Sequence, residues 1–244
     1  MSSRPQVWAH RGASSEAPEN SLAAFARAIA VGADGIELDV QRTADGILVV
    51  THDETTDRLT GQPGQVAQLT LADLRRLDFA AFWPDQPAVI LPTLDEVLDL
   101  CRNTSLRINI ELKNSEVPYR GMEKQVVGRV KAFGLQDQVI YSSFNPMSLW
   151  RLSWIAPHAP KGYLYSDVRP RPWLPACLTG VTALHPSTAN LGVPGLVLRA
   201  HSHRLAVHVW TVDEPGQWEQ CRQLAIDAII TNQPREALEF YNRI

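Results

Sequence analysis

Acidic side chains occupy alternate positions in two short stretches of this sequence that are otherwise largely apolar. Glu37 and Asp39 lie in residues 35–41, and Glu111 lies in residues 107–112. Alternate residues of a strand point to the same face, so each stretch predicts a strand with its acids on one side. Several carboxylates on one face repel one another, and an all-oxygen set favours a hard cation, Mg²⁺ or Ca²⁺, over zinc. A salt-bridge network with nearby arginine and lysine residues is the alternative.

Two histidines and two cationic residues complete the chemical pattern. His10 and His52 each end a predicted strand, and histidine titrates close enough to neutral pH to serve as a general acid or base. Arg11 and Lys113 add positive charge that suits a phosphate, and Arg11 offers a planar fork of donors. Trp210 is predicted to point inward as one wall of a pocket, with a place in the core as the alternative.

The segment that carries His52 toward the acids has the pattern of a β-hairpin. Residues 47–52 form a strand-like run soon after the 35–41 strand, with Asp45-Gly46 between them. A two-residue turn at Asp45-Gly46 would place Asp39 opposite His52. A longer loop would shift this pairing.

These side chains need a scaffold that gathers several strand ends at one place. Short apolar runs alternate with helical patterns along the chain, which predicts an α/β fold, a (β/α)₈ TIM barrel in one domain over residues 1–244. Active sites of this architecture lie at the carboxyl ends of the strands. A small inserted subdomain is expected after the second-strand hairpin, at about 53–92. The barrel strands are expected at 7–10, 35–41, 107–112, 139–143, 161–164, 182–185, 206–211 and 227–231, with helices including 21–31, 93–103, 122–133 and 215–224.

Composition limits the function classes. The formal net charge of −3 and the pI near 6.2 give little electrostatic reason to bind nucleic acid. No apolar run reaches the length of a signal peptide or a membrane span, which predicts a cytoplasmic protein without an integral membrane segment. Three widely spaced cysteines suggest neither a disulfide framework nor a zinc site.

An ordered set of short motifs resembles the glycerophosphodiester phosphodiesterase family. No single tetrapeptide decides the matter, but the set runs in family order over nearly the whole chain. The matching stretches are His10-Arg11-Gly12, Pro18-Glu19-Asn20-Ser21, Glu37-Leu38-Asp39-Val40, His52-Asp53, Leu91-Pro92-Thr93-Leu94, Glu111-Leu112-Lys113, Ser143-Phe144 and Val209-Trp210-Thr211-Val212.

The resemblance implies hydrolysis of a small glycerophosphodiester to sn-glycerol 3-phosphate and an alcohol. It further implies a divalent cation on the three acids, the two histidines as the acid/base pair, and phosphate contact from Arg11 and Lys113. Near the C-terminus the family often has Thr-Asp before a proline, whereas this chain has Thr231-Asn232, so Asn232 is expected to cap the last helix. A lysophospholipase D acting on acylated lipids and a non-catalytic phosphate-binding barrel are the alternatives. The oligomeric state stays open.

Overall fold

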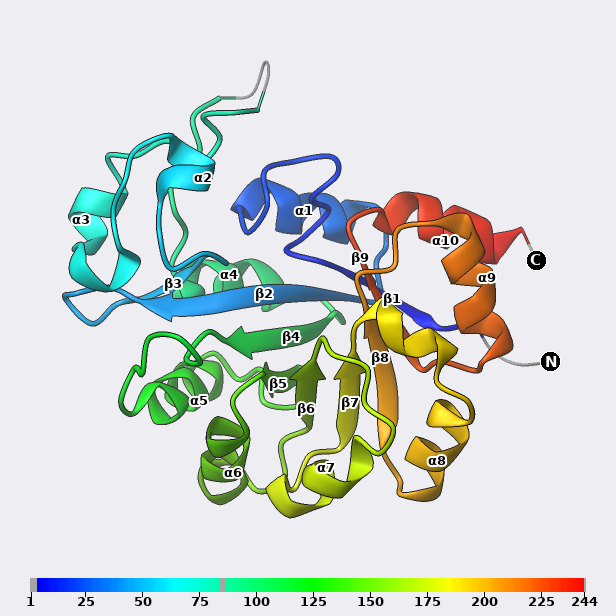
Figure 1. The fold of residues 1–244 in the computed structure, drawn as a ribbon. Coiled ribbons are helices and arrows are strands. Elements are labelled where there is room, and N and C mark those ends of the chain that lie inside the picture. The colour runs from blue at the N-terminus through cyan, green and yellow to red at the C-terminus, as the bar shows by residue number, and fades with distance from the viewer. Residues whose placement is uncertain (1–3, 84–86, 244) are drawn as a thin grey trace.

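The protein is described by a computed structural model that covers residues 4–83 and 87–243. Eight parallel strands close into a barrel because the first strand pairs with both the last and the second, and a ninth, short strand pairs antiparallel with the second (Figure 1). The TIM barrel predicted from the sequence is therefore confirmed. The strands are β1 (Gln6–Ala9), β2 (Gly35–Arg42), β3 (Leu48–Val50), β4 (Arg107–Leu112), β5 (Val139–Ser143), β6 (Lys161–Tyr165), β7 (Ala183–Pro186), β8 (Ala206–Trp210) and β9 (Ala228–Thr231).

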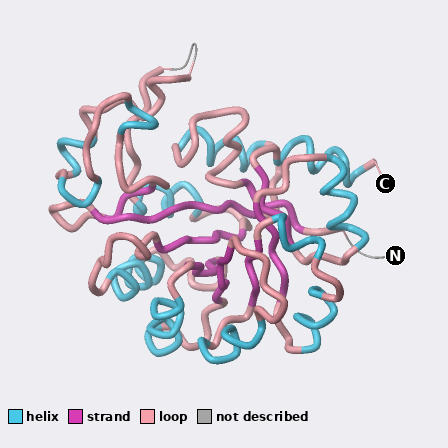
Figure 2. Tube along the Cα trace, viewed as in Figure 1, coloured by secondary structure: helices cyan, strands magenta, loops and turns pink. Residues whose placement is uncertain are grey.

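Helices surround the strands, which gather at the centre of the molecule (Figure 2). The four helices named from the sequence are confirmed, with bounds that differ by at most two residues. The helices are α1 (Leu22–Ala30), α2 (Asp57–Thr60), α3 (Leu71–Leu74), α4 (Leu94–Cys101), α5 (Met122–Ala132), α6 (Pro146–Ile155), α7 (Trp173–Thr179), α8 (Leu196–Ser202), α9 (Pro215–Gln223) and α10 (Pro234–Asn242), with short 3₁₀ turns η1 (Val66–Gln68) and η2 (Thr188–Gly192).

The period of two in β2 decides which side chains reach the barrel interior. Ile36, Leu38 and Val40 are fully buried in the apolar layer between the strands and the helices. Their neighbours Glu37 and Asp39 therefore point inward. The same alternation holds in β4, so the inward residues of the two strands meet inside the barrel.

The β2–β3 hairpin differs from the pairing expected from the sequence. Val40 pairs with Val50, so Asp39 lies opposite Thr51, whose N–H donates to the Asp39 carbonyl at 3.0 Å, and not opposite His52. The loop has three residues instead of two, because Gly46 takes a left-handed backbone (φ 83°) that extends the turn. The prediction that Asp39 faces His52 was wrong by one residue.

An insertion follows β3 and returns to the barrel at α4. It carries α2, η1 and α3 and has a small apolar cluster of its own, formed with one residue of β3: Val49, Val66, Leu74, Phe79 and Leu91. The inserted subdomain expected after the hairpin is present. Among the described residues, no helix has the length and apolar character needed to cross a membrane.

Candidate active site

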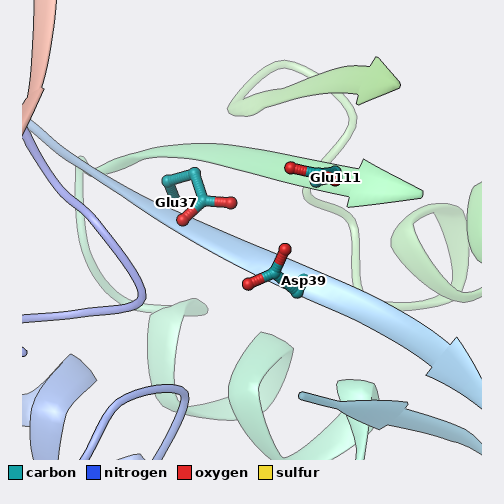
Figure 3. A group of neighbouring side chains, drawn as sticks. All are labelled: Glu37, Asp39 and Glu111. Carbon is teal, nitrogen blue, oxygen red and sulfur yellow. The ribbon is translucent and has the colours of Figure 1, made fainter. Parts of the chain in front are cut away.

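Three carboxylates converge on the inward faces of the neighbouring strands β2 and β4. The strand register pairs Asp39 with Glu111 and Glu37 with Asn109. Figure 3 shows Glu37 and Asp39 projecting from β2 and Glu111 from the adjacent β4. One oxygen of each carboxylate lies within 4.8 Å of the others, and all three side chains are buried. The acids that the sequence analysis selected thus form one cluster.

Burial and mutual repulsion disturb the protonation of this cluster. Burial, and then the charges of Asp39 and Glu111, raise the pKa of Glu37 well above its ordinary value. Burial and the charge of Asp39 also raise the pKa of Glu111. Burial acts upward on Asp39 as well, but Arg11 and further nearby cations outweigh it and lower the Asp39 pKa. The positive charge around the cluster therefore does not offset the burial and repulsion that disfavour ionised Glu37 and Glu111.

The donor set fits a divalent cation. Asp39 Oδ1 is buried without a hydrogen-bond partner, and so are both amide atoms of Asn109, the β4 residue that pairs with Glu37. Opposite oxygen ligands of Ca²⁺ lie roughly 5 Å apart, twice the usual metal–oxygen distance, and the 4.8 Å spread of the carboxylate oxygens is compatible with that span. A cation bound there would relieve the repulsion that raises the pKa values of Glu37 and Glu111.

His10 lies just beyond the end of β1, where a chain of hydrogen bonds fixes its ring. Its Nδ1 bonds to Asn232 Oδ1 at 2.8 Å, and Asn232 Nδ2 donates to Asp213 Oδ2 at 2.6 Å. A carboxylate only accepts hydrogen bonds, so the Asn232 amide must turn its NH₂ group toward Asp213 and its oxygen toward His10. Since that oxygen is also an acceptor, His10 carries its proton on Nδ1. Nε2 is left as an acceptor 4.0 Å from Glu37 Oε2. Burial and the charge of Arg11 lower the pKa of His10 to about 4.

The turn after His10 aims Arg11 at the acids. Arg11 adopts a left-handed backbone (φ 55°), and its N–H donates to Glu37 Oε2 at 3.0 Å. Gly12 follows with φ 81°, and a Cβ there would lie 2.6 Å from Ala24, so the turn requires glycine. The Arg11 guanidinium lies 3.4 Å from Asp39 Oδ2, and its buried Nε has no hydrogen-bond partner.

His52 reaches the cavity from the start of the insertion. Its Nδ1 bonds to Asp53 Oδ1 at 2.6 Å, and Asp53 also contacts Arg58. The buried Gln41 side chain donates to the carbonyls of His52 and Asp53, at 3.0 and 2.6 Å. Arg58 continues the ionic network to Glu19 at 2.7 Å. A carboxylate and a run of ion pairs therefore hold this second histidine.

Lys113 stands just past the end of β4. Its Nζ lies 3.3 Å from Glu111 Oε1. Burial acts to lower the Lys113 pKa, but the charges of Glu111 and Asp39 outweigh it, so the pKa is raised. Lys113 is therefore a fixed positive charge at the edge of the acid cluster.

Aromatic and aliphatic side chains form the other wall of the cavity, which has a volume of about 70 Å³. Trp210 Nε1 donates to the His185 carbonyl at 2.8 Å, and its ring meets Phe144 edge-on at 5.7 Å. Trp210 thus lines the pocket, as the sequence suggested. The cavity is lined by His10, Arg11, Glu37, His52, Asn109, Glu111, Phe144, Leu164, Trp210 and Ile230.

Comparison with known proteins agrees with this geometry. Residues 10–236 match the model of the glycerophosphoryl diester phosphodiesterase family. The chain belongs to this family. A glycerophosphodiester phosphodiesterase from Caldanaerobacter subterraneus subsp. tengcongensis is 39% identical over 238 residues, which cover 97% of this chain and 98% of the relative. The enzyme class expected from the sequence, a phosphoric diester hydrolase, is confirmed.

Solved structures of the glycerophosphoryl diester phosphodiesterase family share the fold. The crystal structure of a glycerophosphodiester phosphodiesterase from Parabacteroides distasonis matches with a TM-score of 0.87 and 27% identity, covering 100% of this chain and 99% of that one. A phosphodiesterase from Oleispira antarctica, solved in complex with the product sn-glycerol-3-phosphate, matches with a TM-score of 0.86 and 27% identity, covering 98% and 97%.

Within this family fold, the eight residues selected from the sequence divide into two groups. Seven of them line the cavity or belong to the acid cluster beside it, and Lys113 joins them through Glu111. Asp53 and Asp213, which support His52 and His10, had no role predicted from the sequence. Asn232 was expected to cap α10, but it bonds to His10 and Asp213, and Gln233 stands at the N-cap without a side-chain bond.

Proposed function

We propose that this chain hydrolyses small glycerophosphodiesters to sn-glycerol 3-phosphate and an alcohol, with His10 and His52 as its acid/base pair. The observation that carries the proposal is the meeting of both histidines and of Glu37 and Glu111 around one cavity, with Asp39 beside them. A related phosphodiesterase that binds sn-glycerol-3-phosphate supports the choice of substrate.

We assign the metal ligands to Glu37, Asp39 and Glu111, with Mg²⁺ or Ca²⁺ as the cation. When bound, such a cation polarises phosphoryl oxygens and stabilises the charge that develops as the ester bond breaks. Arg11 and Lys113 supply further positive charge for the phosphate, and Trp210 closes the apolar side of the pocket. The chain's own contribution is then to hold the diester and to move two protons.

The hydrogen-bond partners of the two histidines favour different roles. His10 is neutral, with Nε2 free to accept a proton, because its partner Asn232 is an uncharged amide and burial disfavours the imidazolium form. His52 instead has an anionic acceptor, the Asp53 carboxylate, on Nδ1. We assign His10 as the general base and His52 as the general acid that protonates the departing alcohol.

A second, wider cavity supports a polar alcohol as the leaving group. It has a volume of about 400 Å³, and its lining includes Asn114 and Asn145, which directly follow Lys113 and Phe144 in the sequence. Its further lining residues, Pro118, Tyr119, Arg120, Gly121 and Arg151, are mostly polar or charged. A polar head group suits this lining better than an acyl chain, which argues against the lysophospholipase D alternative.

The decisive experiment measures whether activity depends on a divalent cation. Turnover of glycerophosphocholine and glycerophosphoethanolamine should stop when a chelator is added and return with Mg²⁺, Ca²⁺ or Mn²⁺. The restoring cation should also raise the thermal unfolding temperature, because it binds the acids only in the folded state. Glu111→Gln should abolish both effects. Full activity in excess chelator would overturn the metal assignment, and faster turnover of acylated diesters would overturn the substrate assignment.

A further inference from the structure

The side of the barrel formed by α6, α7 and α8 exposes large apolar side chains. Trp154 is 74% exposed and Trp150 is 46% exposed, and their rings pack edge-to-face with centroids 6.1 Å apart. In Figure 1 the three helices follow one another along the lower edge of the molecule. We call this surface the α6–α8 face. Its exposed large apolar residues are Met147, Trp150, Trp154 and Ile155 on α6, Val168 before α7, Leu174 on α7 and Leu198 on α8.

The sequence of α6 is apolar on both of its sides. Leu149 and Leu152 are fully buried against the barrel, while Met147, Trp150 and Trp154 follow one another at helical spacing on the outer side. The helix has a single charged residue, an arginine. A helix that is hydrophobic all round is normally covered on all sides. The outer side of α6 is exposed in this chain, so its apolar composition indicates a surface that is covered when the protein binds another molecule or a lipid bilayer.

Charge is distributed unevenly along this chain. Between Asp137 and Asp213 the only acidic residue is Asp167, and all other Asp and Glu residues lie outside that segment. Asp167 pairs with Arg169 at 2.8 Å, and Glu123 of α5 pairs with Arg151 at 3.1 Å. The same segment has six basic residues: Arg151, Lys161, Arg169, Arg171, Arg199 and Arg204. Lys161 is buried, whereas Arg171, Arg199 and Arg204 are exposed and form no ion pair with an acid among the described residues. These three arginines give the α6–α8 face a positive charge, although the whole chain has a net negative one.

We infer that the α6–α8 face docks on a bilayer containing anionic lipids, with Trp150 and Trp154 in the interfacial region. Tryptophan is enriched at membrane–water interfaces, and arginine side chains near the surface of an anionic leaflet each strengthen binding. A helix with exposed Trp and Met, beside arginines on the neighbouring elements, can lie in the plane of the interface. The charge argues against a second copy as the occupant, because a two-fold interface would bring the same arginines together. This inference does not depend on the proposed reaction.

Vesicle co-sedimentation of the full chain tests the inference. The protein should pellet with mixed phosphatidylglycerol–phosphatidylcholine vesicles, bind pure phosphatidylcholine vesicles more weakly, and release as NaCl is raised. Replacing Trp150→Ser and Trp154→Ser together should weaken binding about tenfold or more, since both interfacial anchors are removed. Phe82→Ser is the matched control, because Phe82 is 67% exposed but lies in the insertion, away from the α6–α8 face.

A charge-reversal variant, light scattering and oligonucleotide binding distinguish docking on a bilayer from dimer formation and from binding of nucleic acid. Arg171→Glu, at an exposed position, should also weaken vesicle binding, and hydrolysis of a soluble diester should be unchanged in both variants. Equal loss in the Phe82→Ser control, or no binding of the unmodified protein to anionic vesicles, would overturn the inference. So would a dimer in light scattering that the Trp variant converts to monomer, or tighter binding of a labelled oligonucleotide than of vesicles.

Discussion

His10 and His52 serve one cavity from two different kinds of structure. His10 follows a barrel strand, its side chain is 16% exposed, and an amide on the opposite end of the chain holds its ring. His52 begins the insertion, its side chain is 33% exposed, and an adjacent carboxylate inside an ionic network holds it. The barrel side thus places a neutral amide on its imidazole, whereas the insertion side places a carboxylate on its imidazole. The division of roles that we propose rests on these surroundings and not on the two residues themselves, which are chemically identical.

Removing each histidine gives the largest expected effect and tests the difference directly. His10→Ala and His52→Ala should each lower kcat by about 10²–10⁴ on a natural diester. Their combined loss should be less than the product of the two, because residues that act as one unit are not additive. Near wild-type rates in both variants would contradict the two-histidine mechanism.

The leaving group separates the roles of the two histidines. A nitrophenyl diester releases an acidic alcohol that needs no proton on departure, so His52→Ala should lose little of its activity on this substrate. His10→Ala should remain severely impaired, because the base is still required. The opposite order in steady-state kinetics would exchange the assignments of acid and base.

The partners of the two histidines should matter by smaller amounts. Asp53→Asn keeps the shape of the side chain but removes the charge beside His52, and we expect kcat to fall about 10–100-fold, as is usual for residues that orient a catalytic ligand. Asn232→Ala removes a neutral partner and should cost about tenfold, at the lower end of that range. Both effects should appear in kcat more than in KM.

Ser14→Ala is the matched control for the barrel side. The Ser14 hydroxyl donates its hydrogen toward Asn232 Oδ1 and the His10 carbonyl oxygen, both at 2.8 Å, but it does not bond to the imidazole. Its removal should leave kcat nearly unchanged. If Asn232→Ala proved more damaging than Asp53→Asn, the contrast between a neutral and a charged partner would not describe the two sites.

The contrast also explains which parts of the site the sequence could predict. Glu37, Asp39 and Glu111 followed from a period of two in two strands, which is a local property of the chain. The Asn232–His10 bond joins positions 222 residues apart, and no local pattern encodes it. The predicted hairpin register was wrong for a different reason. The backbone conformation of Gly46 decides whether the loop has two or three residues, and that choice shifts the pairing of the two strands by one residue. The barrel was predictable because the alternation of strand and helix patterns recurs along the whole chain, so an error in one element does not change the fold class.

The smallest expected effect concerns acid stability, which should separate the barrel interior from the insertion. Beneath the cavity, His185 and His208 are buried and joined by a 2.9 Å hydrogen bond. Burial lowers the pKa of His208 to about 4, and burial together with the charge of His208 lowers the pKa of His185 well below its usual value. Both rings therefore resist protonation in the folded protein.

The sign of the pH dependence follows from these shifts. The unfolded chain takes up protons on these histidines near pH 6.5, while the folded protein does not, so their contribution to stability is complete above about pH 6.5 and is lost as the pH falls toward 4. Asp53 in the insertion behaves differently, because hydrogen bonds from His52 and Arg58 lower its pKa. Its contribution to folding stability is complete above the ordinary aspartate pKa, near pH 4, and is lost only as the pH falls below that value. We expect the thermal unfolding temperature to drop by several degrees between pH 6.5 and 4.5. His208→Phe should flatten that slope and Asp53→Asn should not, and an equal change in both variants would show that the two regions do not titrate separately.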